Sequence, residues 1–364
     1  DTEFMVDHGA EMMLEIARFW SSLATYNAER DRYEIHGVMG PDEFHERYPG
    51  AADGGLRNNA YTNVMVAWLC NIAQQVLELL PARAASALRA KIGLTDEETM
   101  TWERMSRRMF IPFHDEGIIS QFEGYEQLAE LDWDSYRERY GNVQRLDRIL
   151  RAEGDDPNRY KVAKQADTVM LFYLFGDDEL AEVFGRLGYE LAPDATRRNV
   201  EYYDRRTSHG STLSFVTHAA VMAPLDPASS WERFLVALES DIGDVQGGTT
   251  QEGIHLGVMA GTLDLIQRGY LGTEIRGDVL AFAPRLIDRL DGLSFGMEIR
   301  GTPVRVSLAG RELSVTSEAL GGRLEVAVGG ERRELAPGCR CTFTLGASPT
   351  VDDQPPEVGH AIEF

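Results

Sequence analysis

The sequence has little lysine and no long hydrophobic run. Lysine occurs at three positions only, and 59 acidic residues against 36 basic ones give a formal net charge of -23. A surface of this charge repels a phosphate backbone, which excludes nucleic acid as a partner. No apolar run approaches the roughly 20 residues that a membrane-spanning helix needs, so we expect no membrane partner either.

Cysteine is also scarce. The three cysteines, Cys70, Cys339 and Cys341, are an odd number, and the last two are too close in sequence for an unstrained bridge within one strand. This use of cysteine favours a reducing compartment and predicts a cytoplasmic location. The chain begins "DTEFM" with no initiator methionine, which suggests a fragment or a processed piece. Its 364 residues suffice for one large domain and one small one.

Residues 1–292 predict a helical domain. Apolar residues recur at helical spacing in the stretches 6–20 and 64–79. Further helices are expected at about 83–92, 96–110, 165–175, 178–187, 211–223, 228–240 and 253–268. Tight turns separate the two members of a pair, and long polar loops join one pair to the next, as in a repeat of helical hairpins. In such a toroid we expect the long loops to converge at one end and to hold the functional site.

From residue 293 the apolar period changes to two. The segments "SFGMEIRGTPVRVSLAGRELSVTSE" and "RLEVAVGGERREL" alternate apolar and polar residues between glycine turns. This pattern is typical of antiparallel strands. The sequence therefore predicts a mainly α chain, with a helical toroid over residues 1–292 and a small antiparallel β domain over residues 293–364.

The first long loop, "GVMGPDEFHE", concentrates titratable side chains. After its Gly-Pro turn, the carboxyls of Asp42 and Glu43 can have pKa values pushed apart, so that one stays protonated as a general acid. We take Glu43 as the candidate, while Asp42 or Glu46 could donate instead, and the loop could equally cap a helix or bind a cation. Past this loop, "NNAYTN" places Asn59 and Tyr61 where they could bind sugar hydroxyls or hold the loop.

Two later loops add candidate ligand-binding side chains. Phe122 and Tyr125 in "GIISQFEGYEQL" could form a wall on which a sugar ring stacks, or could equally fill the core. In "YKVAKQAD" two of the three lysines lie close together. Lys164, followed by Gln165 at the start of an apolar helix, is placed to hold a polar ligand, and a solvated surface lysine is the alternative.

The last two long loops are typical of anion sites. In "YYDRRTSHGSTLS" the imidazole of His209 and the hydroxyl of Ser211 precede a helix whose first N–H groups attract anions. In "DVQGGTTQEG" the backbone at Gly248 and Thr249 can approach a ligand closely, although no Gly-Lys-Ser/Thr follows and the segment is not a P-loop. A plain helix cap and a plain turn are the alternatives.

Together the loops offer one candidate acid and an anion cradle, with no obvious second carboxylate to act as base or nucleophile. Glycoside cleavage with inversion needs an acid for the leaving oxygen and a group that attacks from the opposite face. If that group is phosphate itself, no protein base is required.

These sequence blocks carry a family resemblance. "GVMGPDEFHE", "NNAYTN", "FEGY", "KQAD", "TSHGSTLS" and "TTQEGIHLGVMAG", in this order and over nearly the whole chain, are similar to the signature blocks of glycoside hydrolase family 65, the maltose, trehalose and kojibiose phosphorylases. The resemblance implies an (α/α)6 barrel followed by a small β-sheet domain. It also implies inverting phosphorolysis of an α-glucoside disaccharide to β-glucose 1-phosphate, with no metal, no cofactor and inorganic phosphate as co-substrate.

Carried across, Glu43 matches the family's general acid, and Lys164 and Gln165 match residues that grip the donor glucose. The four residues of the two anion loops fall where the family binds phosphate. Family members are far longer and carry an amino-terminal β-sandwich and the first half of the barrel, so we expect this chain to begin in mid-barrel. We therefore expect either a homo-oligomer or a protein that an amino-terminal half completes.

Two further departures concern the acceptor sugar. The segment "RYPGAADGGLR" makes the acid loop longer than in maltose phosphorylases, and Arg57 stands where the family often has aspartate. These differences leave the disaccharide open. Two other functions remain alternatives, namely an inverting hydrolase of the acid-trehalase type, with water as the attacking group, and a catalytically silent sugar-binding fragment.

Overall fold

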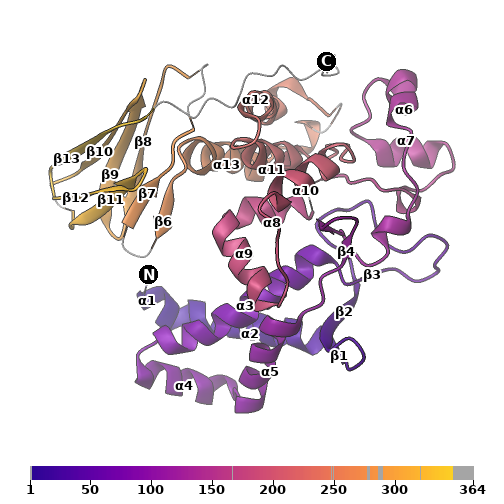
Figure 1. Cartoon of the computed structure of the whole chain (residues 1–364), viewed down its shortest axis with the longest axis horizontal. Helices are drawn as coiled ribbons and strands as arrows, with labels where there is room; N and C mark the ends of the chain where they lie inside the picture. Colours follow the sequence, from indigo (N-terminus) through magenta and orange to yellow (C-terminus); the bar gives the residue numbers. More distant parts are fainter. Residues whose placement is uncertain are drawn as a thin grey trace. The chain divides into compact units, whose positions relative to one another are not determined.

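The computed structural model of the chain describes residues 2–165, 167–246, 248, 250–276, 279–285, 290–319 and 321–346. The chain divides into two compact units, Asp1–Leu265 and Ile266–Phe364. The first unit is mainly helical and the second is built from strands (Figure 1). The mainly α class with a closing β region is thus confirmed.

Helices make up most of the first unit. Its α-helices are α1 (Thr2–Phe4), α2 (Ala10–Leu23), α3 (Ala60–Leu79), α4 (Ala82–Ile92), α5 (Asp96–Arg108), α6 (Trp133–Tyr140), α7 (Leu146–Ala152), α8 (Val169–Leu174), α9 (Asp177–Arg186), α10 (Ala195–Asp204), α11 (Thr212–Met222), α12 (Pro227–Gly243) and α13 (Leu256–Asp264). Turns of π-helix follow α1 and α13, at Met5–Gly9 and Leu265–Tyr270. Short strands lie between α2 and α6: β1 (Ala24–Asn27), β2 (Arg32–Val38) and β3 (Leu56–Arg57) form one antiparallel sheet, and β4 (Phe113–His114) and β5 (Ile118–Ile119) form another.

Local sequence signals explain where several helices begin. Thr95 and Glu98 form a capping box at the start of α5, each satisfying a backbone N–H of the other. Asp226 accepts the Ser229 N–H at the start of α12, whose first residue is proline. The predicted helices match α3, α4, α5, α9, α11 and α12 to within a few residues at each end.

Three helices, α6, α7 and α10, lie where the sequence predicted loops. They are only 7 to 10 residues long and rich in charge, so few apolar positions mark them in the sequence. Helix α8 begins at Val169 rather than at residue 165. Just before this segment the backbone pairs with a distant loop: the Ala163 N–H donates to the Arg206 carbonyl at 2.8 Å.

The core of the helical unit gathers around α3. Buried apolar residues of α2, α3, α5, α8, α9 and α10 form one continuous cluster, which includes the fully buried Trp102 and Met105. A smaller cluster joins Phe44 to Leu146 and Val162, residues far apart in sequence. Since Phe44 follows the candidate acid directly, this cluster fixes the backbone beside Glu43.

The second unit contains two four-stranded sheets. Its strands are β6 (Glu274–Arg276), β7 (Val279–Phe282), β8 (Gly292–Ile299), β9 (Thr302–Ala309), β10 (Glu312–Ser317), β11 (Leu324–Val328), β12 (Glu331–Leu335) and β13 (Arg340–Thr344). One sheet has the order β13-β10-β9-β8 and the other the order β12-β11-β7-β6. Alternate residues of both sheets point into one hydrophobic core, as the period of two predicted.

This unit differs from the prediction in two ways. It begins at Ile266, before the expected boundary at residue 293, because β6 and β7 belong to the second sheet. It is also not wholly antiparallel, because β7 pairs with β11 in parallel, with Leu280 opposite Val326. The run of β7 is too short to show a period, so only its pairing with the later strand reveals it.

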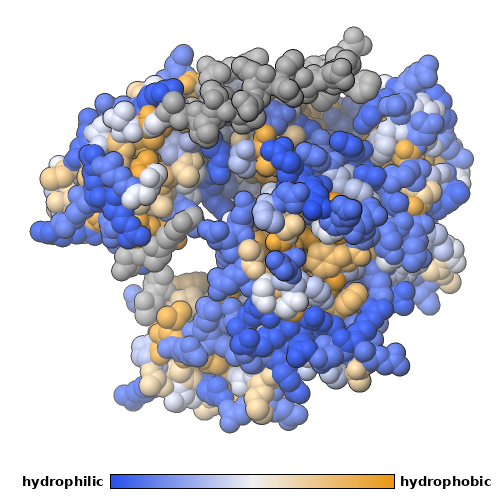
Figure 2. Space-filling model, viewed as in Figure 1, coloured by the Kyte–Doolittle hydropathy of each residue, from blue (hydrophilic) through white to orange (hydrophobic). Residues whose placement is uncertain are grey.

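The surface is mostly hydrophilic on the face shown in Figure 2. Two helical faces nevertheless expose apolar side chains. Residues of α2 at successive turns are about half exposed, and α12 and α13 expose a second set: Met12, Ile16, Phe19 and Leu23, and Leu238, Ile242, Leu256 and Leu263. None of the described helices combines the length and the hydrophobicity that a bilayer crossing requires. All three cysteines are free thiols.

Candidate active site

The long loops of the helical unit are joined to one another, as the hairpin repeat predicted. We name four of them by their key residues: the acid loop (residues 39–59), the aromatic loop (120–128), the lysine loop (160–168) and the histidine loop (205–211). Hydrogen bonds connect them in series: the Glu123 N–H donates to the Arg57 carbonyl (3.1 Å), the Lys164 N–H to Asp42 Oδ1 (2.6 Å), and the Gly210 N–H to the Lys164 carbonyl (2.7 Å).

The candidate acid Glu43 pairs with Lys164. Its Oε2 accepts from Lys164 Nζ at 2.6 Å, with 56% of the Glu43 side chain exposed and 18% of the lysine. The sequence argument expected a carboxyl that stays protonated as a general acid, but the structure leaves this one open to solvent. An exposed carboxylate beside an ammonium group is ready to exchange that partner for a ligand.

Asp42, the neighbouring carboxylate, is almost completely buried, and both of its oxygens accept hydrogen bonds. Its Oδ1 accepts the Lys164 N–H, and its Oδ2 accepts from Gln121 Nε2 at 2.7 Å and contacts His45 Nδ1 at 3.1 Å. His45 in turn reaches the Tyr160 carbonyl at 2.9 Å. Asp42 therefore fastens the acid loop to the lysine loop and has no access to a substrate as a proton donor.

A second buried carboxylate, Asp167, lies in the same network. Its Oδ2 accepts from Asn59 Nδ2 at 3.1 Å, while its Oδ1 is buried without a partner among the described residues. Burial, and then the nearby charge of Asp42, raise the pKa of Asp167 to about 7. Gly40 packs so closely here that an added Cβ would lie 2.3 Å from Asn59 Nδ2 and from Asp167 Oδ2. Only glycine lets the acid loop approach this pair.

Three sequence candidates surround that network. Asn59 is completely buried as the N-cap of α3: its Oδ1 accepts from the Thr62 N–H and hydroxyl at 2.9 Å, and its amide is used as well. Asn59 therefore holds the loop, and the structure contradicts its role as a sugar ligand. Gln165 donates to the Pro41 carbonyl and holds the same loop. Tyr61 is half-buried, and burial raises the pKa of its phenol.

The aromatic loop does not form a wall for a sugar. Phe122 is 1% exposed and Tyr125 is fully buried. Both rings contact the buried His45, at centroid distances of 5.1 and 5.9 Å. The stacking interpretation is therefore contradicted and the alternative, that these rings fill the core, holds. Their aromatic packing instead supports the residue that anchors Asp42.

His209 lies in the histidine loop with a left-handed backbone, φ +53°. This conformation is costly for a residue with a Cβ and is kept where surrounding contacts impose it. The His209 Nδ1 lies 2.9 Å from the Ser214 hydroxyl, and the ring stacks on Phe215 with centroids 4.9 Å apart. Burial, and then the neighbouring His218, hold the pKa of His209 well below its ordinary value, so the ring is neutral near pH 7.

Ser211 and the glycine-rich turn complete the expected anion cradle. Ser211 is the N-cap residue of α11, and its hydroxyl makes no capping hydrogen bond. Gln246 Nε2 donates to the His209 carbonyl at 2.9 Å, which brings the glycine-rich segment beside the histidine loop. The Gly248 N–H, however, donates to the Asp244 carboxylate at 2.7 and 2.9 Å, so a ligand would have to replace that acceptor. Thr249 lies outside the described residues.

The sequence did not single out Asp204, His218 and Arg233, whose side chains form a cluster next to His209. His218 of α11 and Arg233 of α12 both contact Asp204, the last residue of α10. No local pattern distinguishes these positions, because an apolar helix such as α11 hides its one buried imidazole among core residues. Likewise, the sequence of the "KQAD" block gave Asp167 no role beyond its place near the start of a helix.

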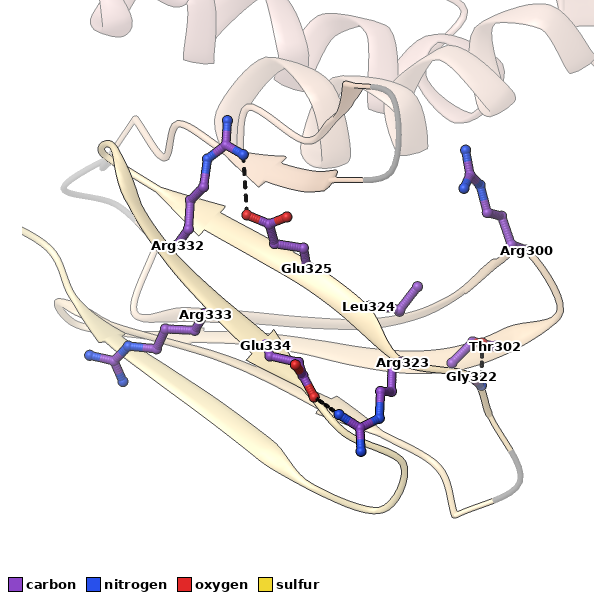
Figure 3. A pocket seen from close by; sticks show the side chains of 9 residues that line it. All are labelled: Arg300, Thr302, Gly322, Arg323, Leu324, Glu325, Arg332, Arg333 and Glu334. Atoms are coloured by element: carbon purple, nitrogen blue, oxygen red, sulfur yellow. Dashed lines mark hydrogen bonds and ion pairs between the residues drawn. The ribbon is translucent and has the colours of Figure 1, made fainter.

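A depression of about 570 Å³ lies elsewhere, on the β unit (Figure 3). Four arginines and two glutamates line it: Arg332 pairs with Glu325 at 3.2 Å and Arg323 pairs with Glu334. Figure 3 shows these pairs lying across the strand surface. None of the candidate residues belongs to this depression.

Comparisons with known proteins place the chain among glycosyl hydrolases. Residues 1–264 match the family model "Glycosyl hydrolase family 65 central catalytic domain", and residues 273–335 match "Glycosyl hydrolase family 65, C-terminal domain". The chain is 50% identical over 349 residues to an uncharacterised glycosyl hydrolase of Mycobacterium tuberculosis, which covers 96% of the chain and 26% of that protein. It is 36% identical over 320 residues to the trehalose 6-phosphate phosphorylase of Lactococcus lactis, covering 88% of the chain and 40% of that protein.

A solved structure titled "Putative kojibiose phosphorylase from human microbiome" has the same fold. It matches with a TM-score of 0.77 at 23% identity, over 96% of this chain and 47% of that one. With the family-model matches, it confirms the predicted α/α toroid followed by a β domain. The chain thus spans well under two thirds of the length of these relatives.

Proposed function

The chain belongs to glycosyl hydrolase family 65, and from this premise we propose that it is the catalytic portion of an inverting glycoside phosphorylase. The enzyme cleaves an α-glucoside disaccharide with inorganic phosphate and releases β-glucose 1-phosphate. The observation that carries the proposal is the position of Lys164, whose side chain binds the candidate acid and whose carbonyl binds the backbone beside His209. One residue thus joins the acid to the anion cradle.

Glu43 serves as the general acid in this proposal. When a glucosyl unit binds, its hydroxyls replace the carboxylate as partners of Lys164. Freed from the ammonium group and covered by sugar, the Glu43 carboxyl can hold a proton and donate it to the glycosidic oxygen. Asp42 keeps the loop in place meanwhile, because its own oxygens stay bound to Lys164 N–H, Gln121 and His45.

Phosphate enters from the side of the histidine loop. The first N–H groups of α11 and the uncapped hydroxyl of Ser211 favour an anion there, and His209 offers its Nε2 while Nδ1 is held by Ser214. A phosphate oxygen attacks the anomeric carbon from the face opposite the leaving oxygen, which inverts the configuration. No protein base is needed, because the attacking group is already an anion.

The reaction requires neither a metal nor an organic cofactor in this proposal. Phosphate is a substrate, and helix N–H groups, a hydroxyl and an imidazole donate hydrogen bonds to it in this proposal. Candidate disaccharides are trehalose, kojibiose and maltose, to which the relative from Lactococcus lactis adds trehalose 6-phosphate. A cytoplasmic location fits the free thiols and supplies the phosphate.

The test incubates the whole purified protein with each disaccharide, nigerose included, with and without inorganic phosphate. Glucose 1-phosphate that forms only with phosphate, and as the β anomer by NMR, supports the proposal. Free glucose in both tubes would instead establish a hydrolase of the acid-trehalase type. If no disaccharide is cleaved while sugars still bind, the silent sugar-binding alternative is correct.

A further inference from the structure

We propose that His218, anchored by Asp204 and Arg233, is a positioning residue that holds the His209 ring at the phosphate site. This inference rests on the proposed function, because it assigns His209 to phosphate. It concerns three side chains on three helices that have no part in the mechanism above.

The contacts run in series from α12 to the histidine loop. Arg233 Nη2 donates to both oxygens of Asp204, at 2.8 and 3.0 Å. Asp204 Oδ1 lies 3.1 Å from His218 Nδ1. The His218 ring meets the His209 ring edge-on, with centroids 4.8 Å apart and planes at 79°. The side chains of Ser214, Phe215 and His218 therefore all contact His209.

His218 is a buried polar residue beside His209. The side chain is completely buried, and its Nε2 has no hydrogen-bond partner among the described residues. Burying an unpaired polar nitrogen costs about 1–3 kcal/mol, which an apolar residue would avoid. A nitrogen of His218, a nitrogen of His209 and an oxygen of Asp204 all lie within 4.8 Å of one another. The polar edge of His218 thus belongs to the His209 cluster.

This cluster has the residue types of a metal site, but its charges favour another role. The guanidinium of Arg233 already occupies both oxygens of Asp204, and a divalent cation would have to displace it. Burial acts to raise the pKa of Asp204, but the His218 hydrogen bond and the charges of His218 and Arg233 hold it well below its ordinary value. Asp204 is therefore a fixed anion that orients His218 through Nδ1, as a carboxylate orients a functional imidazole.

Holding His209 matters because a phosphate must be aimed in line with the anomeric carbon. A shift of the imidazole by about 1 Å is enough to cost up to about 10²-fold in rate. His209 has a left-handed backbone, and contacts with neighbouring side chains set the direction of its ring. Removal of His218 leaves a gap on one face of the ring and frees it to turn.

The experiment compares His218→Gln with His114→Gln in the whole protein. His114 is a matched control: it is a buried imidazole of the same unit, its Nδ1 lies 2.7 Å from a serine hydroxyl, and its Nε2 also lacks a hydrogen-bond partner among the described residues. We expect His218→Gln to raise the KM for phosphate about 10- to 100-fold while the KM for the disaccharide stays within about twofold. His114→Gln should leave both constants near those of the wild type.

Arg233→Lys gives a second variant for the case in which His218→Gln folds poorly. It keeps the positive charge but loses the guanidinium whose Nη2 donates to both oxygens of Asp204, and we expect a smaller rise in the phosphate KM alone. An unchanged phosphate KM in folded His218→Gln, or equal rises of both KM values, would overturn the inference while phosphorolysis by the wild type still supports the proposed function.

Phosphate binding can also be measured without turnover. Inorganic phosphate should raise the melting temperature of the wild type and of His114→Gln, and should do so much less for His218→Gln. If the wild type makes no glucose 1-phosphate but shows this pattern, the proposed function fails and the positioning role stands. If phosphate does not shift the melting of the wild type, both ideas fail.

Discussion

Glu43 and Lys164 form an ion pair in which the lysine nitrogen lies 2.6 Å from Glu43 Oε2. These residues come from different loops, and the pair occupies the place where a donor glucose is proposed to bind. The structure therefore describes the site with its acid and its sugar-binding cation satisfied by each other. Binding of a sugar has to exchange this pair, and the following expectations start from it.

Replacing Glu43 by glutamine removes the proton donor but keeps the shape of the side chain. We expect the rate with a natural disaccharide to fall at least about 10²-fold, and to fall much less with a leaving group that needs no proton. Glu46→Gln, in the same loop and also exposed, serves as the control and should be nearly unchanged. Equal losses with good and poor leaving groups would remove Glu43 from the role of acid.

Lys164→Met should weaken sugar binding. Without the ammonium group the glucosyl hydroxyls lose a charged donor, a hydrogen bond of about 1.5–3 kcal/mol, so the KM for the disaccharide should rise by about tenfold or more. Lys161→Met is a matched control, because Lys161 is also 18% exposed and pairs with a glutamate, Glu130, at 3.3 Å. If both variants raise the disaccharide KM equally, the cause is the loss of a positive charge in general and not the loss of a sugar contact at Lys164.

Asp167 should make the stability of the protein depend on pH. Its pKa is raised from 3.8 to about 7 by burial and by Asp42, so the folded protein keeps a proton that the unfolded chain releases. The free energy of unfolding should therefore fall as pH rises from about 4 to about 7 and lose this dependence above that range. We expect Asp167→Asn to flatten this slope in urea unfolding measured at pH 5 and pH 8.

The control for this experiment is Asp134→Asn, because the side chain of Asp134 is 99% exposed. It should leave the pH dependence of the wild type intact. A slope that is the same in the wild type and in Asp167→Asn would show that Asp167 is ionised in the folded protein throughout this range.

The exposed apolar faces should make the 364-residue chain associate when it is produced by itself. Burying apolar surface yields about 25 cal/mol per Å², and Phe19 of α2 and Ile242 of α12 expose 57% and 89% of their area. We expect the double substitution of Phe19 and Ile242 by glutamate to lower the mass seen by light scattering. Leu79→Glu, at an isolated residue that is 79% exposed, should not. A chain that is monomeric at every concentration would contradict this reading of the two faces.

Sequence reasoning placed the candidate residues on loops that the structure joins, but it misjudged several side chains within them. It singled out Glu43, Lys164 and His209, and the structure joins their loops through hydrogen bonds. It also offered Phe122 and Tyr125 as a sugar wall, although both rings are buried against His45. An aromatic residue in a loop can face inward or outward. Here both rings face inward because they pack on the ring of His45, which is distant in sequence.

The amino-acid sequence by itself determined the class of fold and the order of the loops, because the apolar period and the turn residues act over a few neighbouring positions. It also determined the family, through short blocks whose residues are read directly. Only the tertiary structure decided that Asp42 is an anchor and not a donor, that β7 joins the second unit, and that His218 stands behind His209. These facts depend on contacts between residues distant in the chain, which no local pattern records.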